Sequence, residues 1–380
     1  MSGGSVSGGS ASGPARGAAG GSAAGSREIC FVVPGDIDDA EAPSGGNRYD
    51  RRLCDALTAS GRTVRELAMP GAWPRPGRAA REGLARTLAG LPDGGVVLMD
   101  GLVACGVPDI VVPEAARLRL AVLVHLPLAD EPGQEDLNTG ERKVLEAAGA
   151  VVATSAWAKE HLISHHGLEP SRVHAVPPGT DPASLASGTD GSTRLLSVAS
   201  VTPRKGHDVL VEALGTLAHL PWQCEIVGPL RRDPEYVTRL HRLIARHGLE
   251  ERVHLEGPLI GKRLDDAYAG ADLFVLASRA ETYGMVVSEA LARGIPVLAT
   301  AVDGVPDTLG WDPTGGVPGL LVPPDDPGAL AASLRRWLVT PELRGRLRAS
   351  ARLRRGMLPG WDDTARRMAV VLSRLRREAR

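Results

Sequence analysis

Two glutamates eight positions apart, Glu281 and Glu289, have the type and spacing to bind a ligand. They follow residues 272–277, an apolar run with the length and β-branched content of a buried parallel strand. Glu281 would lie in the loop at the carboxyl end of that strand, where open α/β sheets bind ligands. Residues 284–286 would form a first helical turn whose N–H groups suit a phosphate. Glu289 lies about two turns further on, and its two carboxylate oxygens could accept hydrogen bonds from both hydroxyls of a ribose. The spacing therefore suits a sugar nucleotide lying across a helix start.

A purely structural explanation of the same residues is also open. Glu289 and Arg293 have the i,i+4 spacing of a stabilising ion pair on a helix surface. Glu281 could simply favour the positive end of the helix. On spacing alone, these structural roles are the more common ones.

The elements around the two glutamates predict a strand–helix–strand unit. We expect the helix to end at Arg293, because Gly294 suits the position after a helix and Pro296 prevents its continuation. Residues 295–300 predict the next strand. Similar short apolar runs alternate with helical patterns from residue 27 onward, which predicts an α/β protein. With 380 residues, the chain is long enough for two such domains.

The segment from Glu281 to Glu289, ETYGMVVSE, closely resembles the E-x(7)-E signature of the retaining, nucleotide-sugar-dependent glycosyltransferases with the GT-B fold (the glycosyltransferase family 4 type). The resemblance implies two Rossmann-like domains that face each other across a cleft, with a C-terminal helix packing back on the N-terminal domain. We expect a disordered low-complexity tail at 1–26, an acceptor-binding domain at 27–186, a nucleotide-sugar-binding domain at 187–360 and the returning helix at 361–380.

The resemblance also implies roles for residues outside this segment. Arg204 and Lys205 match a family stretch, R-x(3)-R-K-G, that binds the donor diphosphate, but Ser200 stands where the family usually has an arginine. His125 follows a predicted strand and matches a histidine that contacts the donor sugar near the reacting centre in relatives. A structural histidine is the alternative, and a flexible turn is the alternative for the glycine pair 45–46, which faces the cleft in the family.

The predicted site therefore has two catalytic and ten donor-binding residues. The catalytic candidates are His125 and Glu281. The donor-binding candidates are Gly45, Gly46, Arg204, Lys205, Leu259, Tyr283, Gly284, Met285, Val286 and Glu289.

The implied reaction is transfer of a hexosyl-type group from a nucleoside diphosphate sugar to a small metabolite, lipid or polysaccharide, with retention at the anomeric carbon. Helix amides, Lys205 and Arg204 would stabilise the departing diphosphate, so we expect neither a metal nor another cofactor. The acidic stretches 36–39 and 265–266 are more typical of solvated turns than of a metal site. The histidines 161, 165 and 166 are more typical of an exposed helix face.

Two rival functions remain open. A sugar-nucleotide epimerase or a phosphorylase could share the fold, although the additional acids and histidines of the first and the pyridoxal-phosphate lysine of the second are not evident. A sugar-binding protein without catalysis would hold a sugar nucleotide and not consume it.

Composition excludes several other classes. A net charge of −1 gives no general attraction to nucleic acid or anionic membranes. Six tryptophans, four tyrosines and two phenylalanines are too few for a platform that stacks single strands. No apolar run reaches transmembrane length, and residues 1–26 lack the features of a signal peptide. Four scattered cysteines predict free thiols. We expect a cytoplasmic protein with at most peripheral membrane association.

Overall fold

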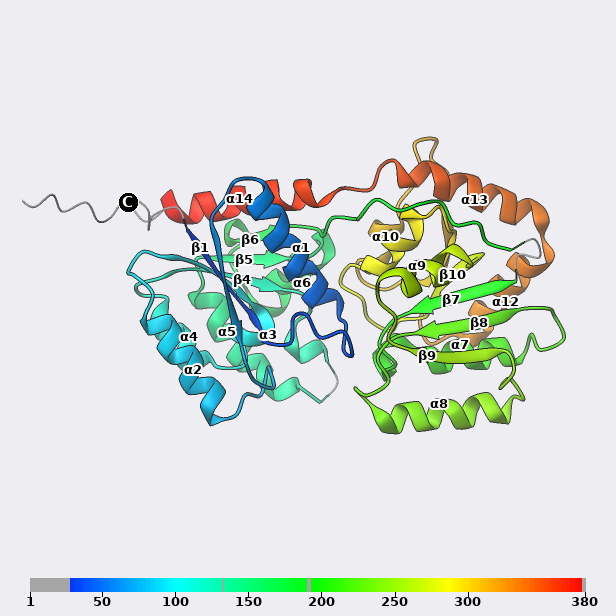
Figure 1. The fold of residues 1–380 in the computed structure, drawn as a ribbon, viewed down its shortest axis with the longest axis horizontal. Coiled ribbons are helices and arrows are strands. Elements are labelled where there is room, and N and C mark those ends of the chain that lie inside the picture. Colours follow the sequence, from blue (N-terminus) through cyan, green and yellow to red (C-terminus); the bar gives the residue numbers. More distant parts are fainter. Residues whose placement is uncertain (1–27, 132, 190–192, 378–380) are drawn as a thin grey trace, which may run out of the picture.

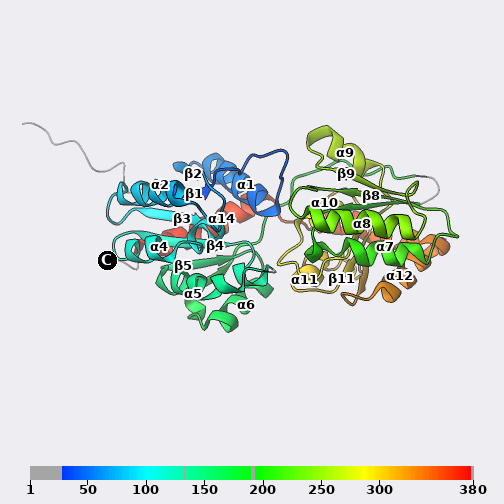
Figure 2. The same cartoon turned by 90° about the horizontal axis from the view of Figure 1, so that it is seen from below.

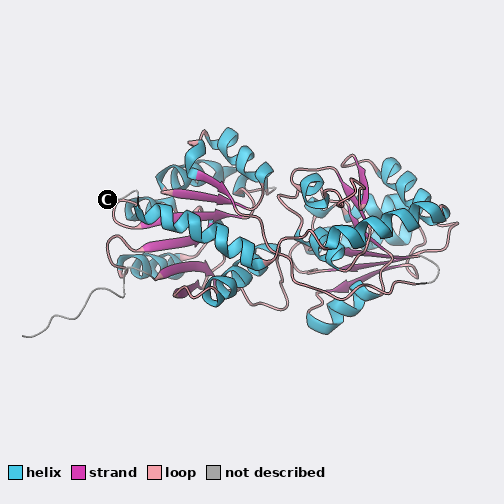
Figure 3. Cartoon of the chain, turned by 90° about the horizontal axis from the view of Figure 1, so that it is seen from above, coloured by secondary structure: helices cyan, strands magenta, loops and turns pink. Residues whose placement is uncertain are grey.

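Two parallel sheets of six strands each organise the molecule, and helices cover both faces of each sheet (Figures 1 and 3). The computed structural model describes residues 28–131, 133–189 and 193–377. The tail predicted at 1–26 lies outside these residues, as do residues 190–192 of the predicted nucleotide-sugar-binding domain. All neighbouring strands run parallel, which requires helical crossovers and confirms the predicted α/β class.

The first sheet has the strand order β2-β1-β3-β4-β5-β6. Its strands are β1 (Ile29–Pro34), β2 (Val64–Met69), β3 (Val96–Asp100), β4 (Arg119–Val124), β5 (Ala150–Ala153) and β6 (Val173–Ala175). The helices of this part are α1 (Gly45–Ala59), α2 (Arg78–Ala89), α3 (Gly101–Ala104), α4 (Pro108–Glu114), α5 (Asn138–Ala147) and α6 (Ala156–His166). The order reverses between β1 and β3, so the loops after these two strands meet at a ligand-binding position of the sheet.

The second sheet has the strand order β12-β11-β10-β7-β8-β9. Its strands are β7 (Arg194–Val198), β8 (Gln223–Val227), β9 (Val253–Gly257), β10 (Leu273–Leu276), β11 (Val297–Thr300) and β12 (Gly319–Val322). Its helices are α7 (His207–Gly215), α8 (Pro234–Arg246), α9 (Gly261–Ala269), α10 (Met285–Ala292), α11 (Val305–Leu309), α12 (Pro327–Val339) and α13 (Pro341–Arg355). Here the order reverses between β7 and β10, which brings the loops of Lys205 and Glu281 together.

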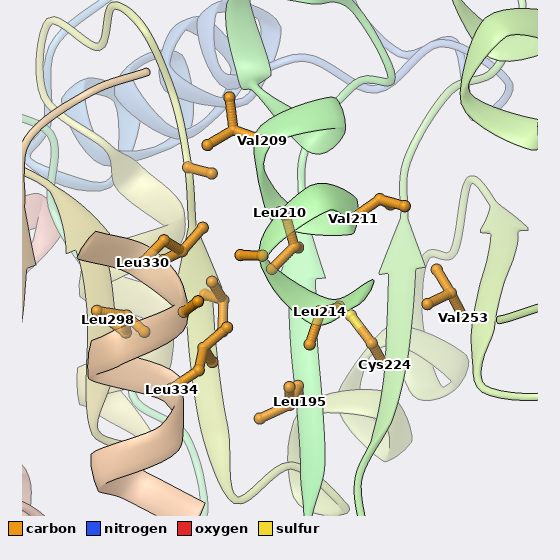
Figure 4. Close-up of a cluster of buried hydrophobic side chains, with 14 of the residues drawn as sticks. Leu195, Val209, Leu210, Val211, Leu214, Cys224, Val253, Leu298, Leu330 and Leu334 are labelled. Atoms are coloured by element: carbon orange, nitrogen blue, oxygen red, sulfur yellow. The ribbon is translucent and has the colours of Figure 1, made fainter. Parts of the chain in front are cut away.

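Leucines on two helices hold one face of the second sheet (Figure 4). Leu210 and Leu214 of α7 and Leu330 and Leu334 of α12 are fully buried against strand residues such as Leu195. Truncating one such leucine to alanine would cost about 2–5 kcal/mol of stability. This packing fixes the base from which the loop of Lys205 projects.

The last helix, α14 (Trp361–Arg377), lies on the first sheet beside α1 (Figure 1). Trp361, Met368 and Leu372 are buried in the same core cluster as Tyr49 of α1. Thr364 Oγ1 donates a hydrogen bond to Pro177 O at 2.9 Å. The predicted return of the C-terminal helix to the N-terminal domain is therefore confirmed.

The strands predicted at 272–277 and 295–300 are present as β10 and β11, each two residues shorter than predicted, and the predicted helix between them is α10, which ends at Ala292. The short helices α3, α4 and α11 have no predicted counterpart, because four to seven residues show no helical periodicity and α4 contains Pro113. All four cysteines are free, and Cys30, Cys105 and Cys224 are buried. Among the described residues, no helix is both long enough and apolar enough to cross a membrane.

Candidate active site

A cavity of about 290 Å³ lies between the two domains, at the carboxyl ends of both sheets. In two views, α1 of the first domain and α10 of the second lie at the facing ends of the domains (Figures 1 and 2). All twelve predicted site residues line this cavity: Gly45, Gly46, His125, Arg204, Lys205, Leu259, Glu281, Tyr283, Gly284, Met285, Val286 and Glu289. The fold therefore brings residues that are 244 positions apart in the chain (45 and 289) to one site, while their roles remain predictions.

Two helices begin at the cavity and point their N-terminal ends into it. Gly284 precedes α10 with a left-handed φ of 84°, which a residue with a Cβ adopts only under strain. Ser44 caps α1, because its Oγ accepts a hydrogen bond from Asn47 N at 3.0 Å. A Cβ placed on Gly45 would lie 3.9 Å from Met285 Sδ, so the two helix starts face each other closely. Both present N–H groups to the cavity, where an anionic ligand is favoured.

Glu281 and Lys205 form an ion pair inside the second domain. Both side chains are 13% exposed. Glu281 also accepts a hydrogen bond from Ser278 Oγ at 3.3 Å, and Asp303 holds its backbone N–H at 2.7 Å. Burial alone would raise the pKa of Glu281, but the charges of Lys205 and Arg204 outweigh it and lower that pKa. Glu281 is therefore an ionised acceptor beside a cation.

Glu289 is a buried carboxylate with partners in both domains. Its Oε2 accepts a hydrogen bond from Tyr268 Oη at 2.9 Å. Its Oε1 lies 2.9 Å from Nη1 of Arg48, which belongs to α1. Arg293, the partner considered in the structural explanation, instead pairs with Asp265 at 2.5 Å. The side chain of Glu289 is thus turned toward the cleft, and the i,i+4 pair is not formed between side chains.

Arg204 also reaches across the cleft. Its Nε lies 3.0 Å from Oε1 of Glu131, in the segment after β4, and its Nη1 donates to Ala280 O at 3.2 Å. The loop is held by Gly206, whose φ is 64° and where a Cβ would collide with the carbonyl oxygen of Ala277. Ser200, the departure from the family pattern, also lines the cavity.

His125 lies at the end of β4, between two buried aspartates. Its Nε2 is 2.8 Å from Asp50 Oδ1 and 3.4 Å from Asp100 Oδ2. Its backbone oxygen accepts a hydrogen bond from Thr282 Oγ1 of the second domain at 2.7 Å. A Cβ on Gly46 would lie only 3.1 Å from His125 Cδ2, so the glycine permits the ring to occupy this place.

The histidine prediction for α6 is partly wrong. His161 faces Asp130 at 3.2 Å, but His166 is buried and its Nε2 lies 3.5 Å from Oε2 of the equally buried Glu141. His166 is buried because it continues the buried face of α6, at the same helical spacing as Ala158 and Leu162. Asp36 and Asp38 lie in a turn after β1, as predicted, and Asp38 pairs with Arg51. Asp265 and Asp266 lie instead within α9, where they pair with Arg293 and Lys262.

Several charged residues that line the cavity or contact its lining residues have no counterpart in the sequence prediction. Asp50 lies on the buried face of α1 between apolar positions, a signal that could have singled it out. Asp100 ends β3 just as His125 follows β4, so adjacent parallel strands predict their proximity. Arg48 lies on α1 and Glu131 in the segment after β4, and only the tertiary fold assigns them partners.

Within the described ranges, Asp50, Asp100 and His125 are the single grouping of metal-ligand types whose atoms all lie within 4.8 Å of one another. The contact of 2.8 Å between Asp50 and the ring is a hydrogen-bond distance. We therefore assign the cluster to hydrogen bonds made by the ring.

Two family profiles match the chain. The family described as "Glycosyl transferases group 1" matches residues 186–354, and "Glycosyltransferase Family 4" matches residues 104–184. A D-inositol 3-phosphate glycosyltransferase of Xylanimonas cellulosilytica is 34% identical over 286 residues, or 70% of this chain. The chain belongs to the GT-B glycosyltransferases of the family 4 type. D-inositol 3-phosphate glycosyltransferase 1 of Catenulispora acidiphila, another family member, is 33% identical over 70% of this chain. The match spans 66% of the length of each relative.

Solved structures show the same GT-B fold for this family member. Sucrose-phosphate synthase from Thermosynechococcus elongatus superimposes with a TM-score of 0.75 at 23% identity, covering 92% of this chain and 99% of that one. Anabaena HepE in complex with UDP-glucose gives a TM-score of 0.72 at 18% identity, covering 91% and 99%. At these identities, the likeness establishes the fold alone.

Proposed function

We propose that the protein transfers a glycosyl group from a nucleoside diphosphate sugar to a hydroxyl acceptor, with retention at the anomeric carbon. The observation that carries the proposal is the convergence of Lys205, Glu281, Glu289 and the start of α10 on one cavity. A cation and helix amides are suited to bind a diphosphate. One carboxylate on each side can accept hydrogen bonds, Glu281 from the hydroxyls of the sugar and Glu289 from those of the ribose.

The charges in the cavity support departure of a diphosphate. As the bond between the anomeric carbon and the diphosphate oxygen breaks, negative charge grows near Lys205, Arg204 and the amides that begin α10. The acceptor hydroxyl forms its bond on the same face, and its proton passes to the departing oxygen. These groups would supply the stabilisation without a metal ion, and unchanged transfer in the presence of EDTA would test that.

The acceptor we propose to test first is a small phosphorylated polyol. Its support is the name of the two relatives described above, which are D-inositol 3-phosphate glycosyltransferases. Arg48 and Arg232 line the cavity and could bind an acceptor phosphate. Lipid and polysaccharide acceptors are tested beside it in the same glycosyl-transfer assay. A cytoplasmic location is part of the proposal, and the free cysteines support a reducing compartment.

A thermal-shift screen against sugar nucleotides and free nucleotides tests donor binding. A ligand at 100 times its dissociation constant should add about 2.7 kcal/mol of stability. Stabilisation by the sugar nucleotides of one base identifies the donor, and no stabilisation by any of them at saturation would contradict the proposal.

Product analysis then separates the proposed transferase from its rivals. Proton NMR of the product reports whether the anomeric configuration is retained. A sugar-binding protein would bind the donor and release no nucleoside diphosphate with any acceptor. An epimerase would change the donor sugar without an acceptor.

A further inference from the structure

We propose that Asp50 and Asp100 are positioning residues for the ring of His125 and that the negative charge of Asp100 keeps this ring protonated, so that it acts in the cleft as a hydrogen-bond donor and not as a base. That His125 donates a hydrogen bond to the sugar nucleotide rests on the proposed function. The charge of the ring does not depend on that function, and it can be measured on the protein without a ligand.

The geometry places both carboxylates on the same ring nitrogen. Nε2 lies 2.8 Å from Asp50 Oδ1 and 3.4 Å from Asp100 Oδ2, and both aspartates are at most 2% exposed. A neutral ring could keep its proton on either nitrogen, but two buried carboxylates at Nε2 require a proton there. His125 is the single cation that the described structure places against them.

The two aspartates differ in what stabilises them. Asp100 Oδ1 accepts the N–H of Leu102 at 2.5 Å, in addition to the contact with the ring. Asp50 Oδ2 is buried and has no hydrogen-bond partner among the described residues. A proton on this oxygen, donated toward Asp100, removes the cost of an unpaired buried charge. Asp100 therefore carries the negative charge of the cluster, and Asp50 is neutral.

The surroundings of the three groups agree with this assignment. Burial raises the pKa of Asp50 to about 8, whereas contacts with His125, Asp50 and Leu102 outweigh burial and lower the pKa of Asp100. Burial lowers the pKa of His125, but the two aspartates outweigh it and raise that pKa to about 10. The other titratable group that faces the ring is Tyr49 of α1, whose ring meets it edge-on at 5.1 Å. Burial raises the pKa of Tyr49 well above its usual value, so this phenol is neutral.

This charge state limits what His125 can do. Because Nε2 is engaged by the aspartates, Nδ1 is the ring nitrogen left for a ligand, and in the imidazolium it carries a hydrogen. The ring lines the cavity, and 19% of the side chain is exposed. The charges of His125 and Asp100 cancel, so the cluster can donate a hydrogen bond to a sugar oxygen without adding net positive charge beside a cationic anomeric carbon.

The ring charge is measured by NMR on protein carrying ¹⁵N-labelled histidine, titrated from pH 6 to 10. The His125 signals are assigned by their loss in His125→Asn. We expect the His125 midpoint at least two pH units above about 6.5, the usual pKa of a histidine side chain. A ring that is neutral at pH 7.5 would overturn the proposal, whatever the variants do.

Variants then test the two aspartates. The double variant Asp50→Asn/Asp100→Asn removes both carboxylates, and we expect its His125 ring to be neutral at pH 7.5. Asp50→Asn alone replaces a neutral group by a similar amide and should leave the ring protonated. Asp55→Asn, at an exposed position of α1, is the matched control. A protonated ring in the folded double variant would contradict the role of the aspartates.

Turnover provides a readout that a purely structural role would not move. With the sugar nucleotide found in the ligand screen, we expect kcat to stay flat between pH 6 and 8. A base at His125 would instead give a rate that rises with pH. If no sugar nucleotide is consumed, the proposed function fails, while the NMR titration still decides the charge of the ring.

Discussion

Arg48 Nη1 lies 2.9 Å from Glu289 Oε1, and this ion pair joins α1 of the first domain to α10 of the second. Arg204 and Glu131 form a second pair across the cleft, at 3.0 Å. Both pairs engage residues expected to bind the donor, so a bound nucleotide would have to replace partners that the free protein already has. We therefore expect the two pairs to couple donor binding to the separation of the domains.

The cross-cleft pairs predict a more open molecule when they are removed. Arg48→Met combined with Glu131→Gln leaves the closed form without either pair, so we expect a larger radius of gyration by small-angle X-ray scattering. Each pair is partly exposed and contributes at most about 1 kcal/mol, so high salt should open the wild type in the same direction. Arg81→Met removes an exposed ion pair with Asp109 inside the first domain. This variant should leave the radius of gyration unchanged.

Replacing Lys205 by methionine should weaken nucleoside diphosphate binding at least tenfold. The change removes a cation expected to contact the diphosphate, and a hydrogen bond to a charged group contributes about 1.5–3 kcal/mol. Isothermal titration calorimetry measures the affinity. Lys262→Met is the matched control, because Lys262 pairs with Asp266 on the surface and is 86% exposed. Equal affinities for both variants would show that Lys205 does not contribute to binding of the nucleoside diphosphate.

Gly46→Ala should lower kcat while its neighbour Gly45→Ala should not lower it to the same extent. A Cβ at position 46 lies 3.1 Å from His125 Cδ2 and displaces the ring, whereas at position 45 the nearest atom is Met285 Sδ at 3.9 Å. Both glycines begin α1, where alanine is a good helix former, so loss of folding does not explain a difference. The prediction is checked by measuring kcat for the two variants, and their melting temperatures show whether both are folded. An equal kcat in both would contradict it.

Gly206→Ala should destabilise the fold more than Gly248→Ala. The two glycines have nearly the same left-handed φ, 64° and 63°, which costs about 1–2 kcal/mol for a residue with a Cβ. At position 248 the added Cβ meets open space, but at position 206 it collides with Ala277 O, which adds about 1–3 kcal/mol. Urea unfolding of both variants measures the difference. Equal losses in the free energy of unfolding would show that the loop of Lys205 moves to make room for the added Cβ.

Stability should fall as the pH rises from 6.5 to 9. The pKa of His125 is about 10 in the folded protein and near 6.5 in an unfolded chain, so the folded state binds more protons in this range. Its contribution is fully present below pH 6.5 and is lost as the pH approaches 10. The pKa of Asp50, about 8, acts in the same direction up to that pH. Melting temperatures across this range should decline more steeply for the wild type than for His125→Asn.

The sequence predicted the parts of the site that are local in the chain. The strand β10, the loop of Glu281, Gly284 and the helix of Glu289 follow one another within 30 residues, and their turn and cap chemistry is visible in the residue types. The twelve predicted residues meet at one cavity because parallel strands place their carboxyl ends at the same edge of a sheet.

The partners of these residues could not be predicted in the same way. His125 and Asp50 are 75 positions apart, and Arg48 and Glu289 are 241 positions apart. Such pairs depend on how the domains face each other and on side-chain rotamers, which leave no periodic pattern in the sequence. His166 shows the same limit, because its burial beside the equally buried Glu141 depends on how α5 and α6 pack in the folded domain.

The position of α14 has a consequence for the order of folding during synthesis. The side chains of Trp361, Met368 and Leu372 complete the core around β1 and α1, although they are translated more than 300 residues later than those elements. Domains generally fold as they leave the ribosome, with the N-terminal one first. Here the first domain must wait, with part of its apolar surface uncovered, until the second domain and α14 have been synthesised.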